Sequence, residues 1–376
     1  MTELFSLFAV LFVVYAVQCI SAAPPHSVVF LIDSRLRGRL VRHSWPIGPS
    51  QARLFLVNPF LPFLTVVYAD GLPFSFLVGP KGEVSGVDFT ACANSRSMVG
   101  RVAFDLHHRF ASKAKKLFLD DSLIATLHSQ RTAAELAVFL DQLQALRPSK
   151  QQALLDRELH RRFALDTLKE RLQLFSKCTE LLNFIRISLY AFIFLVVPVG
   201  IYILGLQRIW LSLLLTLVFY VFLILWAFRR AERRLYPRRQ DRDLQPLLAI
   251  TLSPFAAIRA IDFLAADLLE NFHPIAIACA FLRAEDFLQF AGRELRRIKF
   301  TTHDTLLENV IRKFLLVQKI DPESLLKPPA PSDPYSRTYC PVCLTQYVIE
   351  EGACNDCGGV PLKLLCSLRG ERRSKR

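Results

Sequence analysis

The chain has 376 residues, of which 52% are hydrophobic and 21% charged, and its formal net charge at pH 7 is +14. Its long apolar runs cover about sixty residues, so roughly three hundred remain for soluble parts, enough for two modest domains. This excludes a protein made of membrane spans alone. The positive charge does not by itself indicate nucleic-acid binding, because residues 229 to 242 carry a net +5 and the tail from 369 to 376 a net +4.

The first apolar run, Leu4 to Ile20, predicts a membrane anchor or a signal peptide over residues 1–23. A cleavable signal normally opens with Lys or Arg, whereas this chain opens Met1-Thr2-Glu3 and its basic residues follow the run. This order favours an uncleaved anchor. The alternative is a signal peptide, because the small residues before Pro24 resemble a cleavage site. Its removal would place residues 24–182 outside the cytoplasm.

Residues 24–182 are expected to form a small soluble α+β domain. Strand-like apolar runs stand at 27–32, 53–57, 63–68 and 74–78, with glycine-containing turn sequences between the later ones. After Ala103 the pattern becomes helical. Two capping boxes, Thr132-x-x-Glu135 and Ser149-x-x-Gln152, predict helices over 133–146 and 150–182, the second long and amphipathic.

Two uncharged apolar runs, 187–206 and 209–228, follow one another and are parted by Gln207 and Arg208. Twenty residues at a helical rise of ~1.5 Å cover about 30 Å, the hydrocarbon thickness of a bilayer. The pair therefore predicts a transmembrane hairpin, with a kink caused by Pro198. A pair of buried helices in a soluble core is the alternative.

The topology follows from the charges that flank the hairpin. Basic residues precede position 187, and an arginine-rich belt follows position 228. By the positive-inside rule both flanks face the cytoplasm, and contact with anionic lipid headgroups accounts for the belt. We expect a multi-pass protein of the cell (inner) membrane whose soluble domains and carboxyl end face the cytoplasm.

Residues 229–320 are expected to form the basic belt and a helical cytosolic domain. Ser253-Pro254 opens one helix, and further helices are predicted near 283–299 and, from the box Thr305-x-x-Glu308, over 306–319. The apolar segment 272–282 is too short to span a bilayer, which favours a buried helix over a re-entrant one. Five prolines make residues 321–338 a semi-rigid linker, which predicts a mobile carboxyl end.

Four of the nine cysteines are spaced for a metal ion. Cys340 and Cys343 form one Cys-x2-Cys pair, and ten residues later Cys354 and Cys357 form a second. Four soft thiolates suit tetrahedral Zn²⁺ and leave no open coordination position, so the predicted zinc is structural. Zinc thiolates also need a reducing compartment, which agrees with a cytoplasmic carboxyl end.

Residues 339–362 resemble the zinc-ribbon tails of many bacterial membrane and regulatory proteins. The shared pattern is Tyr-Cys-Pro-x-Cys, about ten residues, then Cys-x-Asp-Cys-Gly, with a leucine shortly after. Such ribbons commonly carry glycine after the second cysteine, where this chain has Leu344. The resemblance covers residues 339–362 and no other part of the chain, and it implies a miniature zinc-centred fold there. With the basic tail that follows, we expect the ribbon and tail to occupy residues 339–376.

Catalytic residues are not expected, nor any cofactor besides Zn²⁺. The chain has neither a phosphate-binding glycine-rich loop nor a nucleophile motif. His107 and His108, near Asp105, point about 100° apart on a helix and are expected to be surface residues. Asp120-Asp121 and Asp262 are expected to be capping or surface acids.

Together these patterns predict an integral membrane protein, mainly α, with a small N-terminal β-rich domain, a transmembrane hairpin and a C-terminal zinc ribbon. Its expected partners are the lipid bilayer and a protein docked by the ribbon, in an interaction, assembly or regulatory role. Two alternatives stay open. One is a membrane enzyme or transporter subunit with a site where the hairpin meets the helical domain, marked by a polar residue such as Ser188, Ser212 or Thr216. The other is a membrane-tethered nucleic-acid binder.

Overall fold

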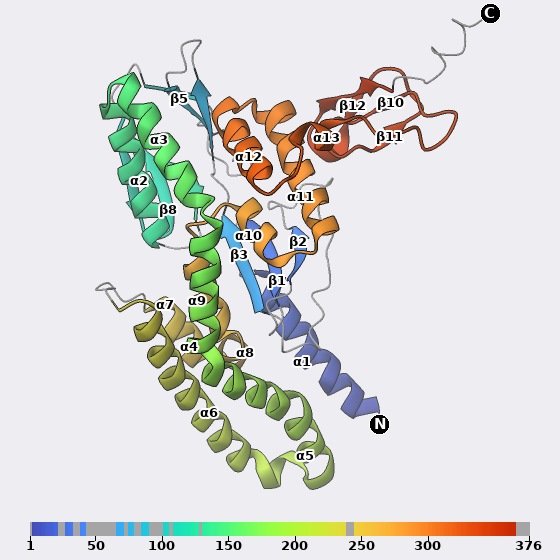
Figure 1. Cartoon of the computed structure of the whole chain (residues 1–376). Helices are drawn as coiled ribbons and strands as arrows, with labels where there is room; N and C mark the ends of the chain where they lie inside the picture. Colours follow the sequence, from blue (N-terminus) through green and yellow to red (C-terminus); the bar gives the residue numbers. More distant parts are fainter. Residues whose placement is uncertain are drawn as a thin grey trace, which may run out of the picture. The chain divides into compact units, whose positions relative to one another are not determined.

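The computed structural model of the chain (Figure 1) describes residues 2–21, 27–32, 38–42, 65–70, 74–78, 84–89, 101–104, 108–127, 130–237 and 244–365. In this part the chain is mostly helical, with small antiparallel sheets. It divides into two compact units that interleave along the sequence. The first comprises Met1–His43, Arg53–Gly71 and Ala164–Leu282, and the second comprises Ser44–Ala52, Leu72–Phe163 and Arg283–Arg376.

The first unit combines a three-stranded sheet with a helical assembly. The strands β1 (Ser27–Ile32), β2 (Gly38–Arg42) and β3 (Thr65–Asp70) are antiparallel in the order β2-β1-β3. The helices are α1 (Thr2–Ser21), α4 (Leu165–Ala191), the π-helical segment η2 (Phe192–Val196), α5 (Val197–Leu204), α6 (Leu206–Leu235), α7 (Gln245–Leu252), α8 (Pro254–Ile258), α9 (Ala260–Leu269) and α10 (Pro274–Phe281). Helix α9 lies against β3, and α10 lies against β1 and β2.

The predicted helical hairpin is present, with its turn two residues earlier than expected. Gly205 has φ 75°, a left-handed conformation that glycine adopts without a steric penalty, and it ends α5. Gln207 and Arg208 therefore lie in the first turn of α6 rather than in a loop. The irregularity expected from Pro198 is a π-helical turn directly before α5, where the missing proline N–H disrupts the regular hydrogen bonding.

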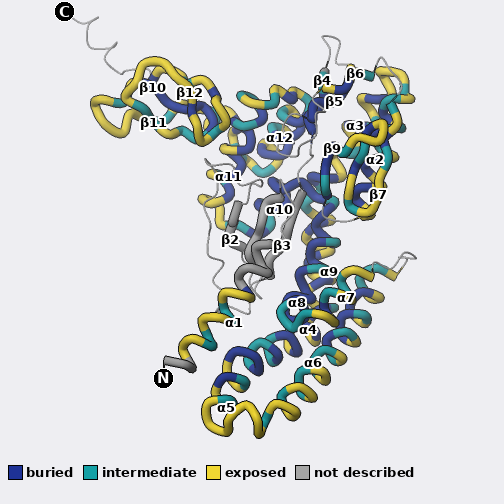
Figure 2. Tube along the Cα trace, turned by 180° about the vertical axis from the view of Figure 1, so that it is seen from behind, coloured by how far each residue is buried: buried dark blue, intermediate teal, exposed yellow. Residues whose placement is uncertain are grey.

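Two helices are long and apolar enough to cross a membrane. They are Leu165–Leu204, taken as α4, η2 and α5 together, and Leu206–Leu235, which is α6. Large apolar side chains on both are exposed, among them Ile203, Leu215 and Phe222 at 68%, 61% and 67%. Figure 2 shows exposed stretches along α5 and α6. Helices α9 and α10 pass the same test only as a pair bent by 118°. Most of α10 is buried, as predicted for segment 272–282.

In the described residues, the second unit holds two small sheets, five α-helices with a π-helical segment, and the β fold at the carboxyl end. Its sheets are β4 (Ser75–Val78), β5 (Val84–Asp88) and β6 (Arg101–Ala103), and β7 (Phe110–Lys113), β8 (Lys116–Leu119) and β9 (Ser122–Thr126), each in chain order. Its helices are α2 (Gln130–Ala145), α3 (Pro148–Arg162), α11 (Ala284–Arg297), the π-helical segment η3 (Ile298–Thr302), α12 (Thr305–Val317) and α13 (Pro322–Leu326). Helix α2 covers β7 and β8. The strands and helices share one apolar core that includes Phe89, Leu117, Ile124 and Leu140.

The prediction of helical structure directly after Ala103 was wrong, because residues 110–126 form three strands. The turn between β8 and β9 contains Asp120 and Asp121, with φ 43° and 70°. Aspartate tolerates this left-handed region better than most residues, and tight hairpin turns require it at both central positions. The pair therefore marks a hairpin. His108 is paired with Asp120 at 2.7 Å, whereas Asp105 and His107 lie outside the described residues.

The long helix predicted over 150–182 is two helices, α3 and α4, separated at Phe163 and Ala164. Leu155 and Leu159 line one face of α3, but the buried face of α4 restarts at Leu168, out of phase with them. The predicted helix starts also shift. Thr132 lies inside α2, Ser149 follows Pro148 in the first turn of α3, and Asp304 rather than Thr305 caps α12.

Several expected features match the structure closely. Strands β1 and β4 fall where they were predicted, β3 begins two residues later than expected, and the run 53–57 lies outside the described residues. The Ser253 hydroxyl caps α8 by accepting a hydrogen bond from Ala256 N at 3.3 Å. Residues 321–338 are not a bare linker, since they contain α13 and contact both neighbouring parts of the second unit.

Candidate metal centre

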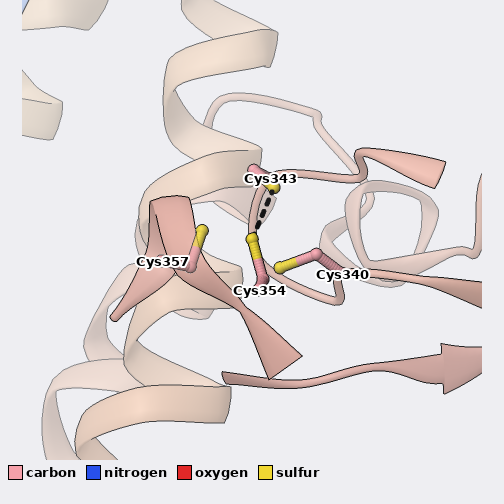
Figure 3. A group of neighbouring side chains, drawn as sticks. All are labelled: Cys340, Cys343, Cys354 and Cys357. Carbon is pink, nitrogen blue, oxygen red and sulfur yellow. Dashed lines mark hydrogen bonds between the residues drawn. The ribbon is translucent and has the colours of Figure 1, made fainter. Parts of the chain in front are cut away.

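The four predicted cysteines come together at the carboxyl end of the second unit (Figure 3). They are carried by a miniature β fold made of β10 (Thr338–Tyr339), β11 (Gln346–Tyr347), β12 (Ala353–Cys354), the 3₁₀ turn η4 (Asn355–Cys357), β13 (Val360–Pro361) and β14 (Lys363–Leu364). Strand β10 pairs with β11 and β14, and β12 pairs with β13. We call residues 338–365 the ribbon.

The four sulfur atoms all lie within 4.8 Å of one another. The Cys343 and Cys354 sulfurs are 3.7 Å apart, far longer than a disulfide bond of about 2.05 Å. Zinc–sulfur bonds of about 2.3 Å in a tetrahedron place the sulfurs about 3.8 Å apart. The cluster therefore has the size and donor set to hold one tetrahedral metal ion.

Backbone hydrogen bonds shape the first cysteine pair. Cys340 N donates to Thr345 O and Leu344 N donates to Cys340 O, each at 2.9 Å, while Val342 N approaches the Cys340 sulfur at 3.4 Å. Leu344 adopts φ 65°. The first loop therefore takes the left-handed turn that such ribbons form with glycine, despite the leucine at this position.

The second pair has the expected glycines. Gly358 and Gly359 have φ 72° and 84°, and Gly359 N donates to Cys354 O at 2.9 Å. Cys340 and Cys354 are fully buried, while Cys343 and Cys357 are half-buried. The site is thus closed toward the ribbon core and partly open on one side.

The thiols do not ionise readily together. Burial raises the pKa of Cys340 to about 11, and burial together with the nearby Cys343 raises the pKa of Cys357. Burial also opposes ionisation of Cys343, but hydrogen bonds with Thr345, Cys340 and Cys357 together outweigh it and lower the pKa of Cys343 to about 7. The Tyr347 hydroxyl donates to the Cys354 sulfur at 3.2 Å, and this bond raises the pKa of Tyr347. Four thiolates at this spacing therefore need a bound cation to offset their repulsion.

Helix α11 holds the ribbon through one buried arginine. Arg296 Nε donates to Val342 O at 3.1 Å and its Nη1 donates to Leu325 O at 2.5 Å. Burial lowers the pKa of Arg296, and the neighbouring Cys343 and Cys340 act in the opposite direction. Phe300 packs on the ribbon core, and Lys363 Nζ lies 4.2 Å from its ring centroid. The ribbon therefore packs on α11 and η3 rather than standing apart from them on the proline-rich segment.

Other candidate residues do not form a second centre of this kind. In the described part of the chain, no other group of three or more His, Cys, Asp or Glu side chains comes this close together. The hydroxyls of Ser188, Ser212 and Thr216 donate to carbonyls of their own helices. Asp262 is not a surface acid, since it pairs with Arg259 at 2.6 Å and both are buried. Sequence reasoning missed Arg296, which sits among other arginines with no distinguishing pattern.

No protein family, curated protein or solved structure matches this chain. The cysteine spacing and the geometry of the cluster therefore carry the assignment of the site.

Proposed function

We propose that the protein is a membrane-anchored, non-enzymatic interaction or assembly factor whose structural zinc ribbon docks a protein partner. The observation that carries this proposal is the cluster of four cysteine sulfurs within 4.8 Å of one another, on a ribbon held against α11 by Arg296. A site with four protein ligands leaves no position for a substrate or a reactive water. It therefore supports a role in shaping a binding module.

The metal we assign is Zn²⁺. Soft thiolates and tetrahedral geometry suit zinc, and zinc with four thiolates has a net charge of −2. The buried Arg296 guanidinium lies near this charge and compensates part of it. Cys340, Cys343, Cys354 and Cys357 are the proposed ligands.

We assign the hairpin of α4, η2, α5 and α6 to the cell membrane, with both flanks in the cytoplasm. Arginines directly after the apolar part of α6 support this orientation. Tyr15 in α1 packs on two aromatic rings, with its ring centroid 5.8 Å from that of Phe194 and 5.9 Å from that of Phe255. These contacts support an uncleaved N-terminal anchor. The ribbon would then stand in a reducing compartment, as its thiolates require.

The ribbon offers apolar groups to a partner. Val348 and Leu364 are 64% and 69% exposed, and Tyr335, just before the ribbon, is 76% exposed. Several exposed apolar side chains on so small a module favour a protein interface. The enzyme or transporter alternative gains no comparable support from the hairpin, because the hydroxyls of Ser188, Ser212 and Thr216 donate to carbonyls of their own helices.

Site-specific photo-crosslinking in cells tests the proposal. A photoreactive residue at Val348 or Leu364 should yield a discrete protein adduct, and Cys354→Ser should abolish it by disrupting the ribbon. Val138 in α2, which is 55% exposed, provides a matched control outside the ribbon. The proposal fails if the ribbon positions give no adduct, or the same adducts as Val138.

A further inference from the structure

The last turns of α6 present an unusual order of side chains on one face. Phe222 and Trp226 are 67% and 53% exposed, and they are followed by Arg229, Arg230, Arg233 and Arg234. At 100° per residue all six fall on one half of the helix surface. Along the axis, the arginines begin about 5 Å beyond Trp226 and continue for about one and a half turns.

The opposite face of the same segment is packed inside the first unit. Ile224, Ala227, Phe228 and Ala231 are buried, and α6 lies against α4. Glu232 is also on the buried side and pairs with Arg229 at 3.0 Å. The aromatic and arginine face is therefore the outward face of the helix.

Three of the four arginines have no acidic partner in the described part of the chain. Arg230 lies with its guanidinium carbon 5.5 Å from the centroid of the Trp226 ring, and Arg233 and Arg234 are exposed. Together with Phe222 and Trp226 they line an open hollow of about 650 Å³ on α6. The hollow thus joins an aromatic floor to a cluster of positively charged guanidinium groups.

We propose that this hollow binds an anionic phospholipid, with the headgroup phosphate on Arg230, Arg233 and Arg234 and an acyl chain along Phe222 and Trp226. Guanidinium groups bind phosphate through paired hydrogen bonds, and tryptophan favours the interface between hydrocarbon and headgroups. Phe222 and Trp226 lie within the apolar part of α6, and the arginines follow directly after its end. A phospholipid has the same order along its length, with the acyl chain first and the headgroup phosphate next. The proposal rests on the membrane insertion of α6 and is independent of the ribbon.

Native mass spectrometry of the full chain in an uncharged detergent tests the site. The probes are phosphatidylglycerol, phosphatidylcholine and inorganic phosphate. The test variant is Arg230→Gln with Arg233→Gln and Arg234→Gln. The control, Lys150→Gln with Arg157→Gln and Lys313→Gln, removes the same charge from exposed positions on other helices. We expect the wild type and the control to retain phosphatidylglycerol over phosphatidylcholine, and the test variant to bind it at least about tenfold more weakly.

A second pair of substitutions tests the acyl-chain part of the site. Phe222→Ala with Trp226→Ala should weaken lipid binding while leaving thermal unfolding without lipid unchanged, because both side chains are exposed. Equal lipid retention by the test and control variants would overturn the proposal, as would competition by inorganic phosphate at the same concentration as the lipid. Because no partner or metal enters the measurement, its result does not depend on whether the ribbon docks a protein.

Discussion

At the scale of single residues, two left-handed positions in the ribbon differ in chemistry. Gly358 has φ 72° and no side chain, and a Cβ added there would meet open space. Leu344 has a similar φ of 65° but carries a full side chain. A side chain in this region costs ~1–2 kcal/mol relative to glycine. The first cysteine loop therefore carries a strain that the second does not.

Substitution at these two positions should have opposite effects. Gly358→Ala should weaken metal retention by ~1 kcal/mol through backbone strain alone, and Leu344→Gly should strengthen it by a similar amount. The measurement is the rate of thiol exposure under a metal chelator. Effects of the same sign would contradict the strain assigned to Leu344 and its absence at Gly358.

Asp304 links two segments that are 228 positions apart in the chain. Its carboxylate accepts hydrogen bonds from Phe76 N at 3.1 Å and from Leu307 N at 3.0 Å, so it joins β4 to the start of α12. Burial raises its pKa, and these hydrogen bonds only partly offset that effect. The folded state therefore binds this proton more tightly than the unfolded chain.

A raised pKa fixes the sign of the pH dependence. The Asp304 contribution to stability is largest when the carboxyl is protonated and falls as pH rises through its folded-state pKa. Wild type should therefore gain thermal stability relative to Asp304→Asn as pH falls from neutral toward about 4, the ordinary range of a carboxyl. A difference between the two proteins that stays constant over this range would contradict the assignment.

At the scale of elements, the contact between α11 and the ribbon depends on the fork geometry of one guanidinium. Arg296 donates to carbonyls of Val342 and Leu325, and Gly292 leaves it room, since a Cβ there would lie 3.1 Å from Arg296 Nη1. A lysine cannot donate from two fixed positions in this way.

Arg296→Lys should therefore loosen the ribbon from α11 at a cost of about 1.5–3 kcal/mol. Limited proteolysis between α13 and β10 should become faster. Arg293→Lys, an exposed change on the same helix, should leave the cleavage rate unaltered. Unchanged cleavage in Arg296→Lys would mean that other contacts hold the ribbon in place.

The elements themselves were predictable where the sequence has long apolar runs or a distinctive residue spacing. The apolar hairpin and the cysteine pairs follow from length and spacing, so the structure shifts only their ends. Short-range signals were weaker: Asp120 and Asp121 resemble helix or surface acids until their φ values identify a turn. Pro148 moved one helix start, because its fixed φ suits the first helical turn.

At the scale of the whole molecule, the interleaving of the two units could not be read from the chain. Phe76 and Asp304 meet within one unit, yet the predicted hairpin lies between them in sequence. Local periodicity carries no information on such pairings. The docking of the ribbon on α11 was missed for the same reason, since Arg296 acts through backbone carbonyls that any sequence supplies.

Metal removal should act locally. The ribbon core around Cys340, Val342, Cys354 and Val360 shares no residue with the core formed by β4–β9 and α2–α3. Chelation should increase hydrogen exchange in residues 338–365 and leave the strands β7–β9 protected. Loss of protection in both regions together would show that the metal supports the whole unit.

The metal content of the purified full chain tests the central claim most directly. Elemental analysis should find one zinc per chain, and Cys354→Ser should lose it while the protein stays in the membrane fraction. Absence of zinc from the wild type, or an unchanged zinc content in Cys354→Ser, would contradict the ribbon as the zinc site and with it the proposed function.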